Sequence, residues 1–213
     1  MATQAILTID IQSFWHPGTG QGLGSHLDAV THRGADKLPA LPGKTVKGLL
    51  RDAVNRWELF GGYEHKPYAE SQTPLVERLF GSPPVRKVSL SKDAEEVNDH
   101  TQGGLLRFDP ACLDPVDRGI LTDKPCLING LYFSHFSTAI DYGSGTAEKN
   151  SLRGIEVVVP LRLYAGIEWF GEEDVLANSW IEALAEALPL VRAVGAHRSR
   201  GFGRATLTIE EAV

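Results

Sequence analysis

Three arginines and three glycines share one short stretch of the chain, VGAHRSRGFGRATL at residues 194–207. The whole chain is acidic, with a formal net charge of −6, yet no acid lies between Arg192 and Glu210. Glycine lets a backbone approach a ligand closely, and an arginine guanidinium group can donate two hydrogen bonds to one phosphate. We call residues 194–204 the glycine-rich loop and expect it to bind phosphate. A solvated tight turn is the alternative.

A second phosphate-binding pattern is PGKTVKG at residues 42–48. Proline and glycine precede a predicted helix, and Lys44 and Lys47 lie in its first turns. Free amides and the helix dipole make such a helix start favourable for phosphate, although an ordinary capped helix with solvated lysines is the alternative. The stretch is no P-loop, because that motif needs a glycine five residues before Gly43, where the chain has Leu38.

Acid–base residues gather in a Gly-, Pro- and His-rich segment that we expect to be a long loop, residues 13–43. His26 and Asp28 form an H-x-D pair, and His32 follows. These side chains could bind a metal or act as a general base; loop residues without chemistry are the alternative. The seven histidines and two cysteines lack zinc-type spacing, so a stand-alone metal hydrolase is not indicated.

Composition describes a globular protein of 213 residues that is 42% hydrophobic. We expect no signal peptide, because the N-terminal MATQAILTID has no basic region before its short apolar stretch. We expect no membrane partner, because no apolar run approaches the roughly 20 residues that cross a bilayer. Cys112 and Cys126 predict free thiols in a cytoplasmic protein. Basic residues concentrate in two segments, 31–56 and 192–204. A local basic groove is therefore possible in an acidic chain.

The periodicity of apolar residues predicts the elements that must position these groups. We expect strands at 4–12, 105–108, 127–142, 155–170 and 204–212, and helices at 44–60 and 172–191. This order favours an α+β fold with a ferredoxin-like (RRM-like) βαββαβ core and insertions. The first helix and the last strand are neighbours in such a core, so the two basic segments should meet on one surface.

Four segments of the chain resemble one family. LPALPGKTVKGLLRDAV at 38–54 is similar to the "PxIPGxSxKGxxR" element of the RAMP superfamily, the RNA-binding proteins of CRISPR systems, and the glycine-rich loop resembles that superfamily's C-terminal loop. TAIDYGSGTAEKNSLRGIEVV at 138–158 and SHLDAVTHRGADKLPALPG at 25–43 resemble segments of type III backbone subunits. The four segments occur in the family's order and span most of the chain.

The resemblance implies a single RAMP domain over residues 1–213. Its ferredoxin-like core would cover about 1–60 and 104–213, with an inserted lid-like segment at about 61–103 and a β-hairpin thumb at about 127–160. Such a protein is a backbone subunit of a type III effector complex. It stacks in several copies along a guide RNA, beside other CRISPR effector subunits, and cleaves complementary target RNA.

The same resemblance assigns roles to single residues. Asp28 matches the aspartate that cuts target RNA, as the catalytic residue and as a ligand of Mg²⁺ or Mn²⁺. Phe136 and Tyr142 would belong to the thumb, with Tyr142 where an arginine is common. Lys44 and Thr45 replace a common serine pair. The implied RNA contacts are Lys44, Thr45, Lys47, Arg51, His197, Arg198, Arg200, Gly201, Gly203 and Arg204, and Trp15 and His16 are further candidates.

Three other functions fit the sequence. The protein could be a scaffold that binds RNA without cutting it. It could be a guide-processing endoribonuclease of the same superfamily, with His26 or His32 as its general base. It could also be an unrelated ferredoxin-like metabolic enzyme, which would not bind RNA at low salt.

Overall fold

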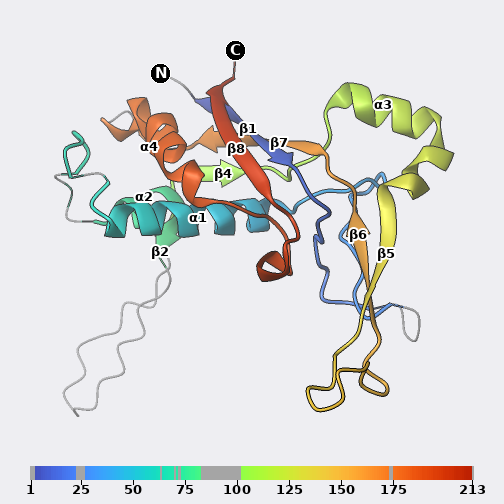
Figure 1. Ribbon diagram of the computed structural model, residues 1–213. Helices are drawn as coiled ribbons and strands as arrows, with labels where there is room; N and C mark the ends of the chain where they lie inside the picture. The colour runs from blue at the N-terminus through green and yellow to red at the C-terminus, as the bar shows by residue number, and fades with distance from the viewer. Residues whose placement is uncertain are drawn as a thin grey trace, which may run out of the picture.

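A four-stranded antiparallel sheet forms the centre of the molecule (Figure 1). The computed structural model describes residues 3–22, 27–62, 64–69, 71, 73–82, 102–172 and 175–212. The strands are β1 (Gln4–Ile11), β4 (Leu106–Phe108), β7 (Arg162–Trp169) and β8 (Ala205–Glu211), in the spatial order β4-β7-β1-β8. The central strand β1 pairs with β7 on one side and with β8 on the other.

Alternating burial explains why the sheet has one core face. Ala5, Leu7, Ile9 and Ile11 of β1 are buried, at every second position of the strand. Two helices join the same hydrophobic core, α1 (Gly43–Leu59) and α4 (Trp180–Ala187). Their buried side chains are Val46, Leu50, Ala53 and Val54 in α1, and Trp180, Ala183, Leu184 and Ala187 in α4.

The α+β class is confirmed by this antiparallel sheet and its helices. The elements of the core follow one another as β1-α1-β4-β7-α4-β8. The ferredoxin-like assignment stays a prediction, which this order supports. The helix expected at 172–191 is shorter, because 3₁₀ turns flank α4 at η2 (Leu176–Asn178) and η3 (Leu188–Leu190).

A two-stranded hairpin projects away from the sheet (Figure 1). Its strands are β5 (Tyr132–Ser137) and β6 (Arg153–Val158), paired in antiparallel register from Tyr132 opposite Val158 to Ser137 opposite Arg153. The single strand expected at 155–170 is thus two strands, β6 and β7, on either side of Pro160, which has no N–H for a sheet ladder. The strand expected at 127–142 is shorter, because the 3₁₀ helix η1 (Pro125–Leu131) precedes β5.

The remaining elements lie outside the core sheet. Helix α3 (Pro115–Asp123) was not expected, and it has no buried residue. Within the expected lid-like segment, α2 (Leu75–Phe80) contacts α1, and β2 (Gly81–Ser82) pairs with β3 (Gln102–Gly103). Residues 83–101 lie outside the described residues. No helix in the described part of the chain is long and apolar enough to cross a membrane, and Cys112 and Cys126 are both free.

Candidate nucleic-acid interface

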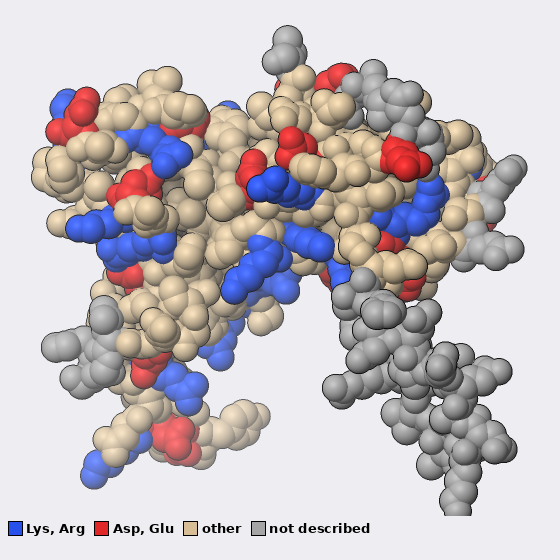
Figure 2. Space-filling view, turned by 180° about the vertical axis from the view of Figure 1, so that it is seen from behind, with Lys and Arg blue, Asp and Glu red and all other residues tan. Residues whose placement is uncertain are grey.

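The glycine-rich loop is a tight, left-handed turn between α4 and β8. Its 3₁₀ helix η4 (Arg198–Arg200) is flanked by His197 at φ 56° and Gly201 at φ 86°. Gly203 has φ 71°, and a Cβ there would collide with the carbonyl oxygen of Val194. The lack of a side chain at Gly203 therefore lets the two ends of the loop pack against each other. The arginines of the loop are exposed. Figure 2 shows lysines and arginines gathered over this loop and the adjoining part of α1, on the underside of the body.

The start of α1 faces this loop. Its N-cap, Pro42, offers no side-chain cap, and the first turn has no acid, which leaves the positive end of the helix dipole uncompensated. Gly43 is required there, because a Cβ would collide with the carbonyl oxygen of Phe108.

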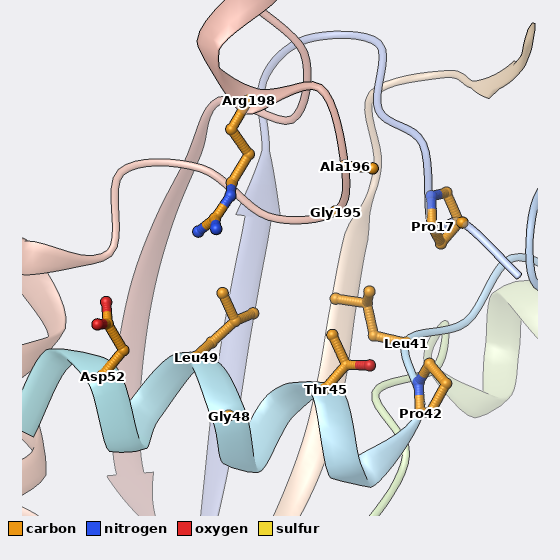
Figure 3. Close-up of a pocket in the computed structure, with 11 residues that line it drawn as sticks. Pro17, Leu41, Pro42, Thr45, Gly48, Leu49, Asp52, Gly195, Ala196 and Arg198 are labelled. Atoms are coloured by element: carbon orange, nitrogen blue, oxygen red, sulfur yellow. The ribbon is translucent and has the colours of Figure 1, made fainter. Parts of the chain in front are cut away.

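A cavity of about 570 Å³ separates the first turns of α1 from the glycine-rich loop (Figure 3). We call it the α1 pocket. Thr45, Gly48 and Asp52 line it from α1, and Gly195 and Arg198 line it from the loop. A neighbouring groove is also lined by Asp52 and Arg198. The expected meeting of the two basic segments is therefore confirmed.

Three of the predicted cations lie beside this pocket instead of in its lining. Lys44, Lys47 and Arg51 follow one another at spacings of three and four residues, so they share one helix face. The residues of α1 that line the pocket lie on an adjacent face. Lys44 is exposed, and Lys47 and Arg51 are half-buried. Arg204, at the end of the loop, is exposed and lines neither this cavity nor the next one.

A second cavity, of about 630 Å³, lies between the outer half of the hairpin and the other side of the glycine-rich loop. We call it the Asp28 pocket. Its lining residues are Asp28, Ala29, His135, Ser137, Thr138, Ala139, Ser151, Arg153, Ile155, His197, Arg200 and Phe202. These residues come from three segments that are far apart in the sequence.

Asp28 is tied to the hairpin by two hydrogen bonds. Its backbone amide donates to the carbonyl oxygen of Gly154 at 2.8 Å, and the amide of Gly154 donates to Asp28 Oδ2 at 2.8 Å. One carboxylate oxygen therefore holds the chain in place. The same residue can still present its other oxygen, Oδ1, to a ligand in the pocket.

Three residues after Asp28, a polar cluster fixes the loop to the hairpin. The carboxylate of Glu156 accepts hydrogen bonds from the amide of Thr31 at 3.0 Å, from the Thr31 hydroxyl group, and from Arg33 Nη2 at 2.6 Å. The Arg33 guanidinium group lies 3.8 Å from the centre of the Tyr132 ring, and the Tyr132 hydroxyl group donates to the carbonyl oxygen of Lys37 at 2.8 Å. We call this arrangement the Glu156 cluster.

Two histidines line the Asp28 pocket, and neither is one that the sequence suggested as a base. The ring centres of His135 and Phe202 are 5.1 Å apart, and those of His197 and Phe202 are 6.4 Å apart. Partial burial, with the nearby charges of His16 and Arg200, holds the pKa of His197 below its ordinary value. His32 does not line this cavity, and His26 lies outside the described residues.

The structure corrects one expectation and adds other residues. Trp15 is fully buried and donates to the carbonyl oxygen of Val159 at 3.1 Å, and His16 is buried as well, so neither is placed to contact RNA. His135, Arg153 and Phe202 were missed. Their spacing gives no signal, because only the folding of the hairpin against the glycine-rich loop brings them to Asp28.

The residues that the structure describes around Asp28 do not form a metal centre of their own. In the described part of the chain, Asp28 is the one carboxylate that lines its pocket, and one of its oxygens is already hydrogen-bonded. Among the described residues no group of three or more histidine, cysteine, aspartate or glutamate side chains could hold an ion.

The hairpin presents aromatic side chains to solvent. Phe136 is 55% exposed and Tyr142 is fully exposed, at the tip. The tip is held by Asp141, whose carboxylate accepts from the amide and the hydroxyl group of Ser144, and these bonds lower its pKa. An ordered hairpin with exposed aromatic side chains is typical of a surface that another molecule covers.

A family model and solved structures place this arrangement among known proteins. The model of the RAMP superfamily matches residues 8–206. The chain belongs to the RAMP superfamily. No curated protein matches this RAMP sequence.

Similar structures come from CRISPR complexes. One is the cryo-EM structure of the type III-B Cmr-β complex bound to cognate target RNA; a chain of it is 11% identical, with a TM-score of 0.63, and the match covers 98% of this chain and 97% of that one. The apo state of the same complex gives a TM-score of 0.64 at 11% identity, with the same coverage. A chain of a type IV-B CRISPR complex has 16% identity and a TM-score of 0.57, over 99% of this chain and 91% of that one. These likenesses show a shared fold.

Proposed function

We propose that this RAMP protein is a guide-RNA-binding backbone subunit of a type III CRISPR effector complex. It stacks in several copies along the guide, beside other effector subunits, and cleaves complementary target RNA at Asp28. One observation carries the proposal. The glycine-rich loop lines both pockets. Arg198 lines the α1 pocket, and Arg200 lines the Asp28 pocket. Nucleic acid bound along this loop reaches both pockets.

The α1 side is the proposed guide-binding surface. An uncompensated helix start and Arg198 would bind successive phosphates, and Lys44, Lys47 and Arg51 would extend the same surface along the adjacent face of α1. The structures of CRISPR complexes that share this fold support RNA and other effector subunits as partners.

The hairpin side is the proposed target-binding surface. RNA supplies its own nucleophile, the 2′-hydroxyl group. Exposed aromatic side chains of the hairpin would splay a nucleotide apart from its neighbours, which lets that hydroxyl group align with the next phosphate. A carboxylate at this point can take part in proton transfer. A requirement for Mg²⁺ or Mn²⁺ stays a prediction, and the cleavage assay tests it with each ion and with a chelator.

One observation favours the non-catalytic scaffold as a second candidate. The hydrogen bond from Gly154 gives Asp28 a structural role that needs no chemistry.

The cleavage experiment uses the complex assembled with its guide. Wild type, Asp28→Asn and Asp28→Ala each receive a labelled complementary RNA, and the products are separated by size. Asn keeps an oxygen that accepts from Gly154, so Asp28→Asn removes the charge and preserves the loop. We expect regularly spaced cuts in wild type and none in either variant, while RNA binding persists.

Asp123→Asn, on the exposed end of α3, is the matched control and should cut like wild type. RNA binding without cuts in the wild-type complex would favour the scaffold. Cuts by Asp28→Asn at the wild-type rate would remove Asp28 from the mechanism.

A further inference from the structure

We propose that His197 accepts the proton of the attacking 2′-hydroxyl group in the Asp28 pocket, and that Arg153 and Arg200 bind the phosphodiester that is cut. The inference rests on the proposed function, because it requires a target RNA strand in this pocket.

The pocket has the size and lining of a ligand site. Its volume of about 630 Å³ lies within the range of roughly 300–1,000 Å³ that is common for ligand pockets. Arg153 approaches from the hairpin and Arg200 from the glycine-rich loop, so two guanidinium groups from different elements share one cavity. Arginine suits phosphate because its donors form a planar fork. The hydroxyl group of Ser137, which lines the same cavity, adds a further donor.

His197 is held in a fixed position on the wall of this pocket. Its backbone is left-handed, at φ 56°, and its carbonyl oxygen accepts from the amide of Arg200 at 2.8 Å. The His16 ring lies 5.7 Å from the His197 ring on one side, and the ring of Phe202 lies at 6.4 Å.

The surroundings keep His197 ready to accept a proton. The groups that face it are His16 from the long loop, Arg200 from its own loop, and Asp28, His135 and Arg153 across the cavity. Burial, and then the charges of His16 and Arg200, hold its pKa below the ordinary value of 6.5. The ring is therefore neutral at neutral pH, and a ring nitrogen can act as a base.

The proposed step is an in-line transesterification. The 2′-hydroxyl proton passes to His197, the 2′-oxygen forms a bond to phosphorus, and the bond from phosphorus to the 5′-oxygen breaks. The leaving 5′-oxygen takes a proton from water, and His197 later returns its proton to water. The products carry a 2′,3′-cyclic phosphate and a 5′-hydroxyl group. Asp28, which lines the same pocket, stabilises the imidazolium ion that forms on His197.

The test compares His197→Asn with wild type in the guide-loaded complex under single-turnover conditions. Asparagine tolerates the left-handed backbone of this position better than most residues, and its side chain cannot serve as a base. Loss of a general base lowers a rate by about 10²–10⁴-fold, and we expect a loss of this size. The wild-type rate should rise with pH and level off by about pH 7, whereas the residual rate of the variant should lack this step.

Two further measurements protect the test against a folding defect. His65→Asn, at an exposed histidine outside both pockets, should cut like wild type. His197→Gly also suits the backbone, and free imidazole added to it should restore cutting, which a merely misfolded loop would not allow.

The outcomes separate this inference from the proposed function. If Asp28→Asn abolishes cutting and His197→Asn cuts at the wild-type rate, His197 is not the base, and the proposed function stands. Products with a 3′-hydroxyl group and a 5′-phosphate also overturn the inference alone. A wild-type complex that binds target RNA and never cuts it overturns both.

Discussion

At the scale of single residues, Asp28 makes a structural hydrogen bond that can be tested apart from its proposed chemical role. Replacing it with alanine removes the acceptor for the amide of Gly154, whereas asparagine keeps an acceptor. We expect Asp28→Ala to lower the free energy of unfolding by about 1 kcal/mol and Asp28→Asn to lower it by less. Denaturant titration of the two variants measures this difference. An equal loss would mean that the bond to Gly154 contributes little.

Two glycines of the glycine-rich loop offer a second comparison. Gly201 and Gly203 both have positive φ, but a Cβ at Gly201 would meet open space, whereas one at Gly203 would collide with the backbone of Val194. Gly201→Ala should lower the free energy of unfolding by about 1–2 kcal/mol, because an alanine is unfavourable in the left-handed conformation. Gly203→Ala should lower the free energy of unfolding by clearly more, because the backbone at Val194 must also shift to make room for the new Cβ. Thermal unfolding compares the two, and similar melting temperatures would contradict the crowding at Gly203.

At the scale of elements, the Glu156 cluster fixes the loop that carries Asp28 to the hairpin. The Glu156 side chain is 12% exposed, and three donors from Thr31 and Arg33 point at it. Glu156→Ala leaves these donors without their acceptor and should destabilise the fold by about 2 kcal/mol. It should also speed hydrogen exchange at the amide of Thr31. Glu148→Ala, at the exposed tip of the hairpin, is the matched control and should change neither quantity.

The hairpin tip should matter for RNA and not for folding. Tyr142 is fully exposed, so Tyr142→Ala should leave the free energy of unfolding within about 0.5 kcal/mol of wild type. Stacking of one base on an aromatic ring contributes about 1–3 kcal/mol. The variant complex should therefore bind target RNA about 5- to 150-fold more weakly, as a titration with labelled RNA would measure. Unchanged affinity would exclude stacking by Tyr142.

The elements show which features the sequence could predict. Residues 4–12 and 44–60 have clear periods of two and 3.6, and the structure has β1 and α1 there. Helix α3 was missed although Val116, Ile120 and Leu121 recur at helical spacing, because it is only nine residues long and none of them is fully buried. The sequence does carry the signal for the start of this helix, because an aspartate at the N-cap, Asp114, is followed by a proline at the first helical position, Pro115.

The candidate site was predictable only in part, for a related reason. Asp28 and the glycine-rich loop could be chosen from residue type and resemblance. His135, Arg153 and Phe202 share their pocket through tertiary contacts between the hairpin and the loop. Such contacts leave no pattern in the spacing of residues along the chain.

At the scale of the whole molecule, the distribution of charge matters more than its sum. The chain carries a net charge of −6, yet one group of its arginines and lysines gathers over the glycine-rich loop and α1 (Figure 2). Local charge of this kind attracts the RNA backbone, while the acidic remainder limits non-specific association.

Salt dependence tests this distribution directly. Each phosphate that a cation neutralises releases counterions and adds about 0.7 to the slope of log affinity against log salt for a single strand. Arg198→Gln and Arg200→Gln should each reduce that slope by about this amount, measured by titrating the full chain with a labelled single-stranded RNA at several salt concentrations. Lys124→Gln, beside α3, removes the same charge far from both pockets and should leave the slope unchanged. Equal reductions in all three variants would mean that RNA responds to net charge alone, and the glycine-rich loop would then lose its special role.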